Sequence, residues 1–460
     1  MTAPTTNRIR EVLAIPAFRR LWGVTALTAT GDWLSLLALS ALATQLTSGY
    51  QAQSFALGGV VATKLLPAML LAPLAGALAD KLDRRHVMVV CDVLRAGLFL
   101  SIPLVGELAW LFIATFLVEV CALFWIPAKD ASVPNLLRRP DQVETANQLA
   151  LIMTYGVTVL TASGLFATLS KLGPALSRIE LIPVAELSAY VALTVSGLAY
   201  LVCALVVGLR IPEISGRTTT RQAVQPGLFT MLREGVVFVR TTPLVRGLVT
   251  GIIGAFAAGG AIIACAKLYA SSLGGGDAAY GVLFASLFVG LGLGMALAPL
   301  LSRRVRRRRL FGRAIVVAGL GLVGVALAPN LFVALGVVVL VGAGAGVAFL
   351  TGLTIIGAEV PDDMRGRTIA FVQSLVRIDL LASMALVPLL VGLVQQRRIT
   401  LFSEQVIIDG TRPVLLGAGL VAAIVGVVAY RQMDDRVHDP LLADLRAAVR
   451  RRRATPGGST

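Results

Sequence analysis

Long apolar segments alternate with short polar ones along almost the whole chain. Twelve apolar segments each have about the 20 residues that a helix needs to cross the hydrocarbon core of a bilayer. Their apolar character is unbroken, which excludes barrel strands, where apolar and polar positions alternate. We therefore expect an all-α integral membrane fold of twelve transmembrane helices. The segments are 20–46, 54–79, 87–106, 108–128, 146–170, 183–209, 245–270, 277–301, 311–329, 331–354, 367–394 and 412–430.

Features of the first six segments recur in the second six. Pro73 near the end of the second segment and Pro299 near the end of the eighth are 226 positions apart, about half the chain. Two six-helix halves related by such a repeat are typical of transporters, with the substrate path between the halves. The predicted parts are an N-terminal half at 1–209, a cytoplasmic linker at 210–244, a C-terminal half at 245–430 and a basic cytoplasmic tail at 431–460.

Composition agrees with a membrane protein. Hydrophobic residues make up 57% of the chain and charged residues 14%, with a mean hydropathy of +0.83. The net charge of +16 is the excess of 41 Lys and Arg residues over 25 Asp and Glu residues. Only five of the 41 basic residues fall in loops on the side opposite the two ends. Since basic loops stay in the cytoplasm, both termini are expected there, with the chain spanning the plasma (inner) membrane. The five are Lys171, Arg178, Arg397, Arg398 and Arg412.

The Arg-rich loop 303–309 could be interpreted as a nucleic-acid contact. It is short and lies between two transmembrane segments, so contact with anionic lipid headgroups is the better interpretation. The four cysteines lie in apolar segments without metal-ligand spacing, and His86 and His438 are far apart. No catalytic residues, metal site or phosphate loop can be identified. We therefore expect no cofactor, no nucleic-acid partner and no enzymatic activity.

Eight ionisable residues fall inside the predicted helices. Charges at a helix centre cost about 2.5–3.5 kcal/mol to insert, so these groups should face a cavity or each other. Four are acidic and four basic, which suggests pairing. They are Asp32, Lys64, Asp92, Arg95, Glu119, Lys267, Arg377 and Asp379.

Asp32 and Glu119 are the deepest acids of the first and fourth segments. A carboxyl group in a dry site can exchange protons near neutral pH, which is what proton coupling needs. The alternative for Asp32 is a permanent ion pair with Arg95 or Lys64. Asp92 is three residues before Arg95, which predicts a structural pair on one helix face.

Three other residues complete the candidate coupling or substrate site. Arg377 and Asp379 are two apart and so point to different faces, and each needs a partner elsewhere. Trp33 lies deep enough in its segment to line a cavity.

The loop Gly76-Ala77-Leu78-Ala79-Asp80-Lys81-Leu82-Asp83-Arg84-Arg85-His86 resembles the G-x-L-A-D-[RK]-x-[GD]-R-[RK] signature of the major facilitator superfamily. Further segments are similar to its transmembrane secretion effector branch, which includes enterobactin-exporter-like and macrolide-efflux-like proteins. They are Phe18–Trp22, Gly31–Trp33, Asp92–Ala96, Pro127–Ala131 and Val133–Leu136.

The resemblance implies a gating motif of Gly76, Asp80, Arg84, Arg85 and Asp130. Asp80 would meet the N-terminus of the eleventh helix, where the helix dipole favours an anion, and Arg84 would pair with Asp130. These contacts would hold the cytoplasmic side closed. The second-half copy of the loop departs from the signature, because Arg306 stands where Asp80 would map.

The resemblance also implies a monomeric secondary transporter with a small-molecule substrate. It would export a drug, macrolide or siderophore type of hydrophobic or amphipathic molecule by alternating access, as an antiporter with protons. A lipid or lysophospholipid flippase of the same fold and a non-transporting membrane receptor are the alternatives.

Overall fold

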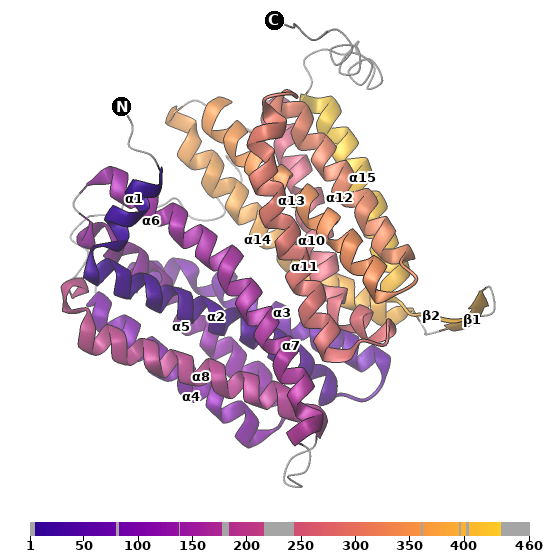
Figure 1. Ribbon diagram of the computed structural model, residues 1–460, viewed down its shortest axis with the longest axis horizontal. Coiled ribbons are helices and arrows are strands. Elements are labelled where there is room, and N and C mark those ends of the chain that lie inside the picture. Colours follow the sequence, from indigo (N-terminus) through magenta and orange to yellow (C-terminus); the bar gives the residue numbers. More distant parts are fainter. Residues whose placement is uncertain are drawn as a thin grey trace, which may run out of the picture.

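The computed structural model describes residues 5–79, 82–137, 139–176, 184–215, 243–359, 362–394, 397–401 and 404–433. Long helices dominate it (Figure 1). In the first part of the chain they are α2 (Pro16–Gln45), α3 (Tyr50–Ala79), α4 (Arg84–Val105), α5 (Leu108–Leu136), α7 (Thr158–Leu176) and α8 (Val184–Arg210). In the second part they are α10 (Pro243–Ser272), α11 (Gly276–Ser302), α12 (Arg307–Leu327), α13 (Leu331–Glu359), α14 (Asp362–Leu393) and α15 (Thr411–Met433).

Among the described residues, ten helical segments are long and apolar enough to cross a membrane. The 30-residue α3 and the 32-residue α14 are also long enough to do so. The expected fold class, an all-α multi-pass membrane protein, is therefore confirmed. The chain-half boundaries stay a prediction, since most of the linker lies outside the described residues.

The helices form two bundles (Figure 1). In the N-terminal bundle, α8 packs against α2 and α4, and α5 packs against α3 and α4. In the C-terminal bundle, α12 packs against α13 and α15, and α11 packs against α13. The bundles meet through α3 with α14 and α7 with α11. The start of the described chain, α1 (Thr5–Leu13), and the last turn of α15 lie at the same end of the molecule in Figure 1.

Short sequence signals mark both ends of α4. Asp83 caps α4 by accepting a hydrogen bond from the backbone N–H of His86 at 3.1 Å. Gly106 ends α4 in the left-handed conformation, with φ of 68°. The four cysteines are buried and free, as their apolar surroundings predict.

Two elements differ from the expected uniform helices. The fifth long segment is divided into α6 (Pro140–Ile152), the π-helix η1 (Met153–Val157) and α7. A hairpin of β1 (Arg397–Leu401) and β2 (Glu404–Ile408) joins α14 to α15 and projects from the bundle in Figure 1. The 3₁₀ turn η2 (Pro212–Ile214) follows α8.

The C-terminal bundle is held together by close backbone contact. A Cβ atom at Gly290 or Gly294 of α11 would collide with the backbone of α13, and one at Gly342 or Gly346 of α13 would collide with α11. Small residues let membrane helices approach in this way. These glycines of α11 and α13 therefore form the packing surface between the two helices.

Candidate functional site

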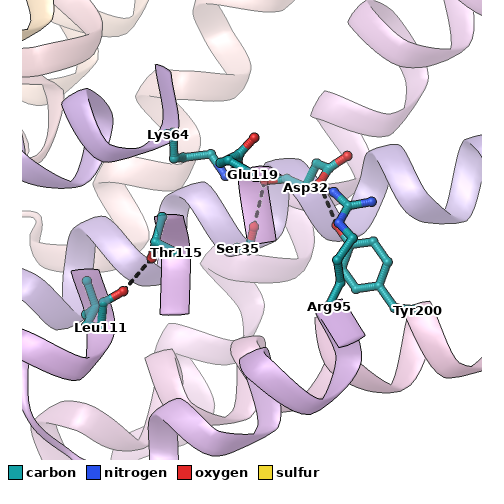
Figure 2. A network of polar contacts seen from close by, with 8 residues as sticks. All are labelled: Asp32, Ser35, Lys64, Arg95, Leu111, Thr115, Glu119 and Tyr200. Atoms are coloured by element: carbon teal, nitrogen blue, oxygen red, sulfur yellow. Dashed lines mark hydrogen bonds and ion pairs between the residues drawn. The ribbon is translucent and has the colours of Figure 1, made fainter. Parts of the chain in front are cut away.

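The centre of the N-terminal bundle holds an ion pair between two helices (Figure 2). Arg95 of α4 donates from Nη2 to Oδ1 of Asp32 on α2 at 2.5 Å. Tyr200 of α8 donates its hydroxyl to the same oxygen at 2.5 Å. The guanidinium also lies over the Tyr200 ring, 4.3 Å from its centroid. One carboxylate oxygen thus accepts both donors.

The two members of this pair differ in exposure. The Arg95 side chain is 2% exposed, whereas that of Asp32 is 39% exposed. Because a charge inside a transmembrane helix faces protein or water rather than lipid, the open side of Asp32 can receive a proton. The geometry matches the ion pair that the sequence left as the alternative role of Asp32. An ion pair of this kind is compatible with either a structural or a coupling role.

A second ion pair lies beside the first (Figure 2). Lys64 of α3 contacts Oε1 of Glu119 on α5 at 2.5 Å, and both side chains are mostly buried. The sequence placed both residues in the candidate site without predicting that they pair. Four of the ionisable residues inside the predicted helices are therefore gathered in one region of the N-terminal bundle.

The predicted pair between Asp92 and Arg95 is not formed. Asp92 is fully buried, and within the described part of the chain neither of its carboxylate oxygens has a hydrogen-bond partner. The reason is the length of the Arg95 side chain, which extends across to α2 and binds Asp32 instead of the acid one turn earlier on its own helix.

Trp33 follows Asp32 and lies in an aromatic cluster that joins the two bundles. Its ring is 5.9 Å from that of Phe284 and 5.3 Å from that of Phe288, both on α11. Its indole N–H donates to the carbonyl of Thr154 in the π-helix at 2.8 Å. π-helical turns release backbone groups from the regular ladder and are frequent at functional sites. The π-helix was missed from the sequence because no motif marks it.

The other candidate residues are not part of this network as far as they are described. Asp379 of α14 has one buried oxygen, Oδ2, without a hydrogen-bond partner. The side chain of Arg377 lies outside the described residues. The pairing of these two with other residues therefore stays a prediction.

The signature loop, residues 76–86, connects α4 to α8 through hydrogen bonds at one end of the bundle. Arg85 donates to the carbonyl of Gly208 in the last turn of α8, where a cation is favoured by the helix dipole. Asp83 accepts a hydrogen bond from Ser215 Oγ at 2.7 Å, just beyond α8. Sequence analysis missed Asp83, although its place before a helix is a capping signal.

The residues of the predicted gating motif are described only in part. Arg84 is buried, and Asp130 is 62% exposed and contacts Lys129 at 2.7 Å. Asp80 lies outside the described residues, and Gly76 lies in α3. The contacts of Asp80 with the eleventh helix and of Arg84 with Asp130 stay predictions.

A polar cavity of about 360 Å³ lies at the other end of the helices. Lys267 of α10 pairs with Asp277 of α11 in its wall. Gln45 of α2 donates to Asp277 Oδ2 at 3.1 Å, which joins the two bundles. Asp409, before α15, also lines the cavity, and burial raises the pKa of its carboxyl above the usual range.

The described residues of this region form pairs of opposite charges rather than a set of metal ligands. The described residues contain no group of His, Cys, Asp and Glu side chains that could hold a metal ion. The central charges are instead two acids and two cations on four helices, in contact across a bundle. Each acid thus contacts a cation that comes from another helix.

Comparison with known proteins identifies a family of membrane transporters and individual transporters that resemble this chain. The family model described as transmembrane secretion effector matches residues 11–445. The MFS-type transporter YfiS of Bacillus subtilis is 24% identical over 402 residues, which cover 80% of this chain and 87% of YfiS. A putative bacilysin exporter, BacE of Bacillus subtilis, is 32% identical over 142 residues, which cover 30% of this chain and 34% of BacE.

The solved structures show the same fold. A bacterial homologue of the human lysosomal transporter Spinster, in an inward-facing and unoccupied conformation, superposes with a TM-score of 0.68 at 16% identity. The match covers 93% of this chain and 98% of that one. The nucleoside transporter NupG superposes with a TM-score of 0.62, also at 16% identity, over 91% and 99% of the two chains.

Proposed function

Because the chain belongs to the transmembrane secretion effector family of major facilitator superfamily (MFS) transporters, we propose that it exports a hydrophobic or amphipathic small molecule in exchange for protons. Membership makes it a multi-pass membrane transporter of small molecules rather than an enzyme. Export, proton coupling and alternating access are the proposed part. We further propose that it works as a monomer in the plasma membrane.

The ion pair of Asp32 and Arg95 is the observation that carries proton coupling. Asp32 is partly accessible, whereas Arg95 is almost fully buried, and among the described residues Arg95 forms an ion pair with Asp32 alone. Protonation of Asp32 would remove the attraction that holds the guanidinium, so proton binding can be converted into side-chain movement. Entry of one proton down a potential of 100 mV supplies about 2.3 kcal/mol, which is enough to drive a modest substrate gradient.

The aromatic cluster supports an apolar or amphipathic substrate. Trp33 on α2 and the rings of Phe284 and Phe288 on α11 come from different bundles. Aromatic rings supply large apolar contact areas for ligands, and this cluster begins one residue from the coupling acid. The match of part of the chain to a putative bacilysin exporter supports outward transport.

A contact between the bundles at one end supports alternating access. The hydrogen bond from Gln45 to Asp277 joins the bundles near the polar cavity. The gating motif of Gly76, Asp80, Arg84, Arg85 and Asp130 is the proposed gate on the cytoplasmic side. Breaking the contacts of one end while forming those of the other would expose the centre to each side in turn.

Orientation is testable by cysteine labelling in intact cells. We propose that both termini and the basic loops are cytoplasmic, with anionic lipids bound at those loops. Gln51 and Arg307 are exposed at opposite ends of the helices, and the native cysteines are buried, so background labelling should be low. An impermeant maleimide should label Gln51→Cys and leave Arg307→Cys unlabelled. The reverse pattern would invert the topology.

Transport itself is tested by flux in reconstituted vesicles. The full-length protein is placed in proteoliposomes with an imposed pH gradient and offered lipophilic dyes, macrolides, siderophores and lysolipids in turn. Gradient-driven accumulation of a dye, macrolide or siderophore supports the exporter. Movement of lysolipid alone would favour the flippase alternative, and binding without any flux would favour the receptor.

A further inference from the structure

Asp92 is a buried acid that the proposed ion pair does not use. It lies in the middle of α4, is 0% exposed, and has no hydrogen-bond partner for either carboxylate oxygen within the described part of the chain. Removing an ionised carboxylate from water without a partner costs several kcal/mol. Such a group avoids this cost either by binding a proton or by gaining a cation.

The nearest cation has a donor to spare. Arg95 follows Asp92 by three residues, so both side chains extend from the same face of α4. Its Nη2 is bound to Asp32, but its Nε is buried and finds no hydrogen-bond partner among the residues that the structure describes. An unused donor and two unused acceptors therefore lie one helical turn apart.

In the described part of the chain, Arg95 is the one basic group that acts on the Asp92 carboxyl. The other groups that act on it are Trp125 and Cys121 of α5 and Asp32 of α2. The indole N–H of Trp125 faces this carboxyl, although within the described residues the two groups form no hydrogen bond of ordinary geometry. Cys91 on α4 and Cys203 on α8 complete the titratable groups nearby. The guanidinium of Arg95 is therefore the cation available to both Asp32, which it contacts, and Asp92, which it does not.

Charge balance decides how the three groups behave. With both acids ionised, Asp32, Asp92 and Arg95 carry a net charge of −1 in a buried site. With one acid protonated they are neutral. The neutral arrangement avoids an uncompensated charge on the buried Asp92, which favours one bound proton for the two acids, on the acid that Arg95 does not contact.

We propose that Asp92 is a second proton-binding residue and that Arg95 alternates between Asp32 and Asp92. When Asp32 takes up a proton, the guanidinium leaves it and pairs with Asp92, whose own proton departs. One proton is bound and one is released, and the net charge of the three groups does not change. The inference rests on the proposed proton coupling, and it adds the step in which a proton leaves the site toward the cytoplasm.

The position of the two acids gives the exchange a direction. Asp92 is eight residues from the first residue of α4, and Asp32 is 16 residues from that of α2. At 1.5 Å per residue, Asp92 is about 12 Å from the proposed cytoplasmic end and Asp32 about 24 Å from it. Uptake of a proton at Asp32 thus releases the Asp92 proton nearer the cytoplasm. The cycle closes when the proton on Asp32 passes to Asp92 as Arg95 returns to Asp32, so that one proton has moved inward.

Infrared difference spectroscopy of the full-length protein in lipid vesicles tests the exchange without a substrate. At neutral pH, Asp92→Asn should remove the C=O stretching band of a protonated carboxyl. Asp32→Asn should remove the same band, because Arg95, having lost its partner, pairs with Asp92 and ionises it. Glu107→Gln, an exposed acid at the start of α5, is the control and should leave the band intact.

Each result bears on the exchange. If Asp92→Asn removes no band, Asp92 does not carry the proton and the inference is wrong. Persistence of the Asp92 band in Asp32→Asn would show that Arg95 does not alternate, even if a pH gradient drives export by the wild-type protein. Conversely, flux that ignores a pH gradient would refute the proposed coupling while the band shifts still show the exchange.

A second measurement covers the case in which the bands overlap. In proteoliposomes containing a transported dye, Asp92→Asn should lose acceleration by the pH gradient and keep downhill dye efflux, because asparagine resembles the protonated acid but cannot release a proton. Acceleration equal to that of the wild-type protein would overturn the inference.

Discussion

The two bundles differ in what fills their interiors. At the centre of the N-terminal bundle, Asp32 with Arg95 and Lys64 with Glu119 form ion pairs between helices. At the centre of the C-terminal bundle, glycines such as Gly294 bring helix backbones into direct contact. The described glycines of the N-terminal bundle meet mainly side chains or open space.

This difference suggests a division of labour. Charged side chains on long stems can exchange partners without moving a helix, whereas close backbone contact between helices leaves no such freedom. We infer that partner exchange occurs among the central charges of the N-terminal bundle. The ion pair of the C-terminal bundle, Lys267 with Asp277, lies at one end beside the polar cavity, and we infer that this bundle moves as a rigid body. The aromatic contact of Trp33 with α11 links the two.

The largest expected effect comes from removing both acids around Arg95. The double variant Asp32→Asn/Asp92→Asn leaves a buried guanidinium without a carboxylate, and breaking a buried pair costs about 3–5 kcal/mol. Each single variant leaves Arg95 one acid and should be much less destabilised. Thermal unfolding of the detergent-solubilised protein measures this. Additive losses of stability from the two single changes would contradict the sharing of one cation.

A smaller effect is expected from overfilling the C-terminal bundle. In Gly294→Ala, the new methyl group would collide with the backbone of Ala343 on α13, and overpacking typically costs about 1–3 kcal/mol. Gly292→Ala is the matched control, since nothing lies within 4 Å of its added Cβ. If both variants unfold at the same temperature, backbone contact does not hold these helices together.

Trp33→Phe should have the smallest effect on stability. It removes the hydrogen bond to Thr154 in the π-helix, a loss of about 0.5–1.5 kcal/mol. Trp110→Phe removes a comparable bond to Ser101 Oγ at 2.9 Å, within the N-terminal bundle. Both should lose similar stability, but only Trp33→Phe should raise the KM for a transported dye. Equal KM values in the two variants would remove Trp33 from the substrate site.

The fold was predictable because membrane helices are specified by length and hydropathy. The segments 108–128 and 277–301, for example, lie inside α5 and α11. The π-helix at Met153–Val157 was not predictable, since no residue type enforces an i→i+5 hydrogen bond. The hairpin β1–β2 was missed because it is short and lies between two long apolar helices.

The sequence identified which residues belong to the site but not which of them form ion pairs with each other. An ionisable residue inside an apolar segment is conspicuous, so Asp32, Lys64, Arg95 and Glu119 were identified. Which acid each cation binds depends on how helices far apart in sequence pack together. The spacing of Asp92 and Arg95 indicated a local pair, yet the long arginine side chain reaches a neighbouring helix.

The most direct test of proton coupling is flux through Asp32→Asn in proteoliposomes, compared with wild-type protein at equal reconstitution. Asparagine resembles a permanently protonated carboxyl, so downhill exchange of substrate should continue while a pH gradient no longer drives net export. The unfolding temperature should fall little, because Arg95 can still pair with Asp92. A stable Asp32→Asn protein that concentrates substrate with unaltered pH dependence would contradict coupling at Asp32 and leave Glu119 as the remaining candidate.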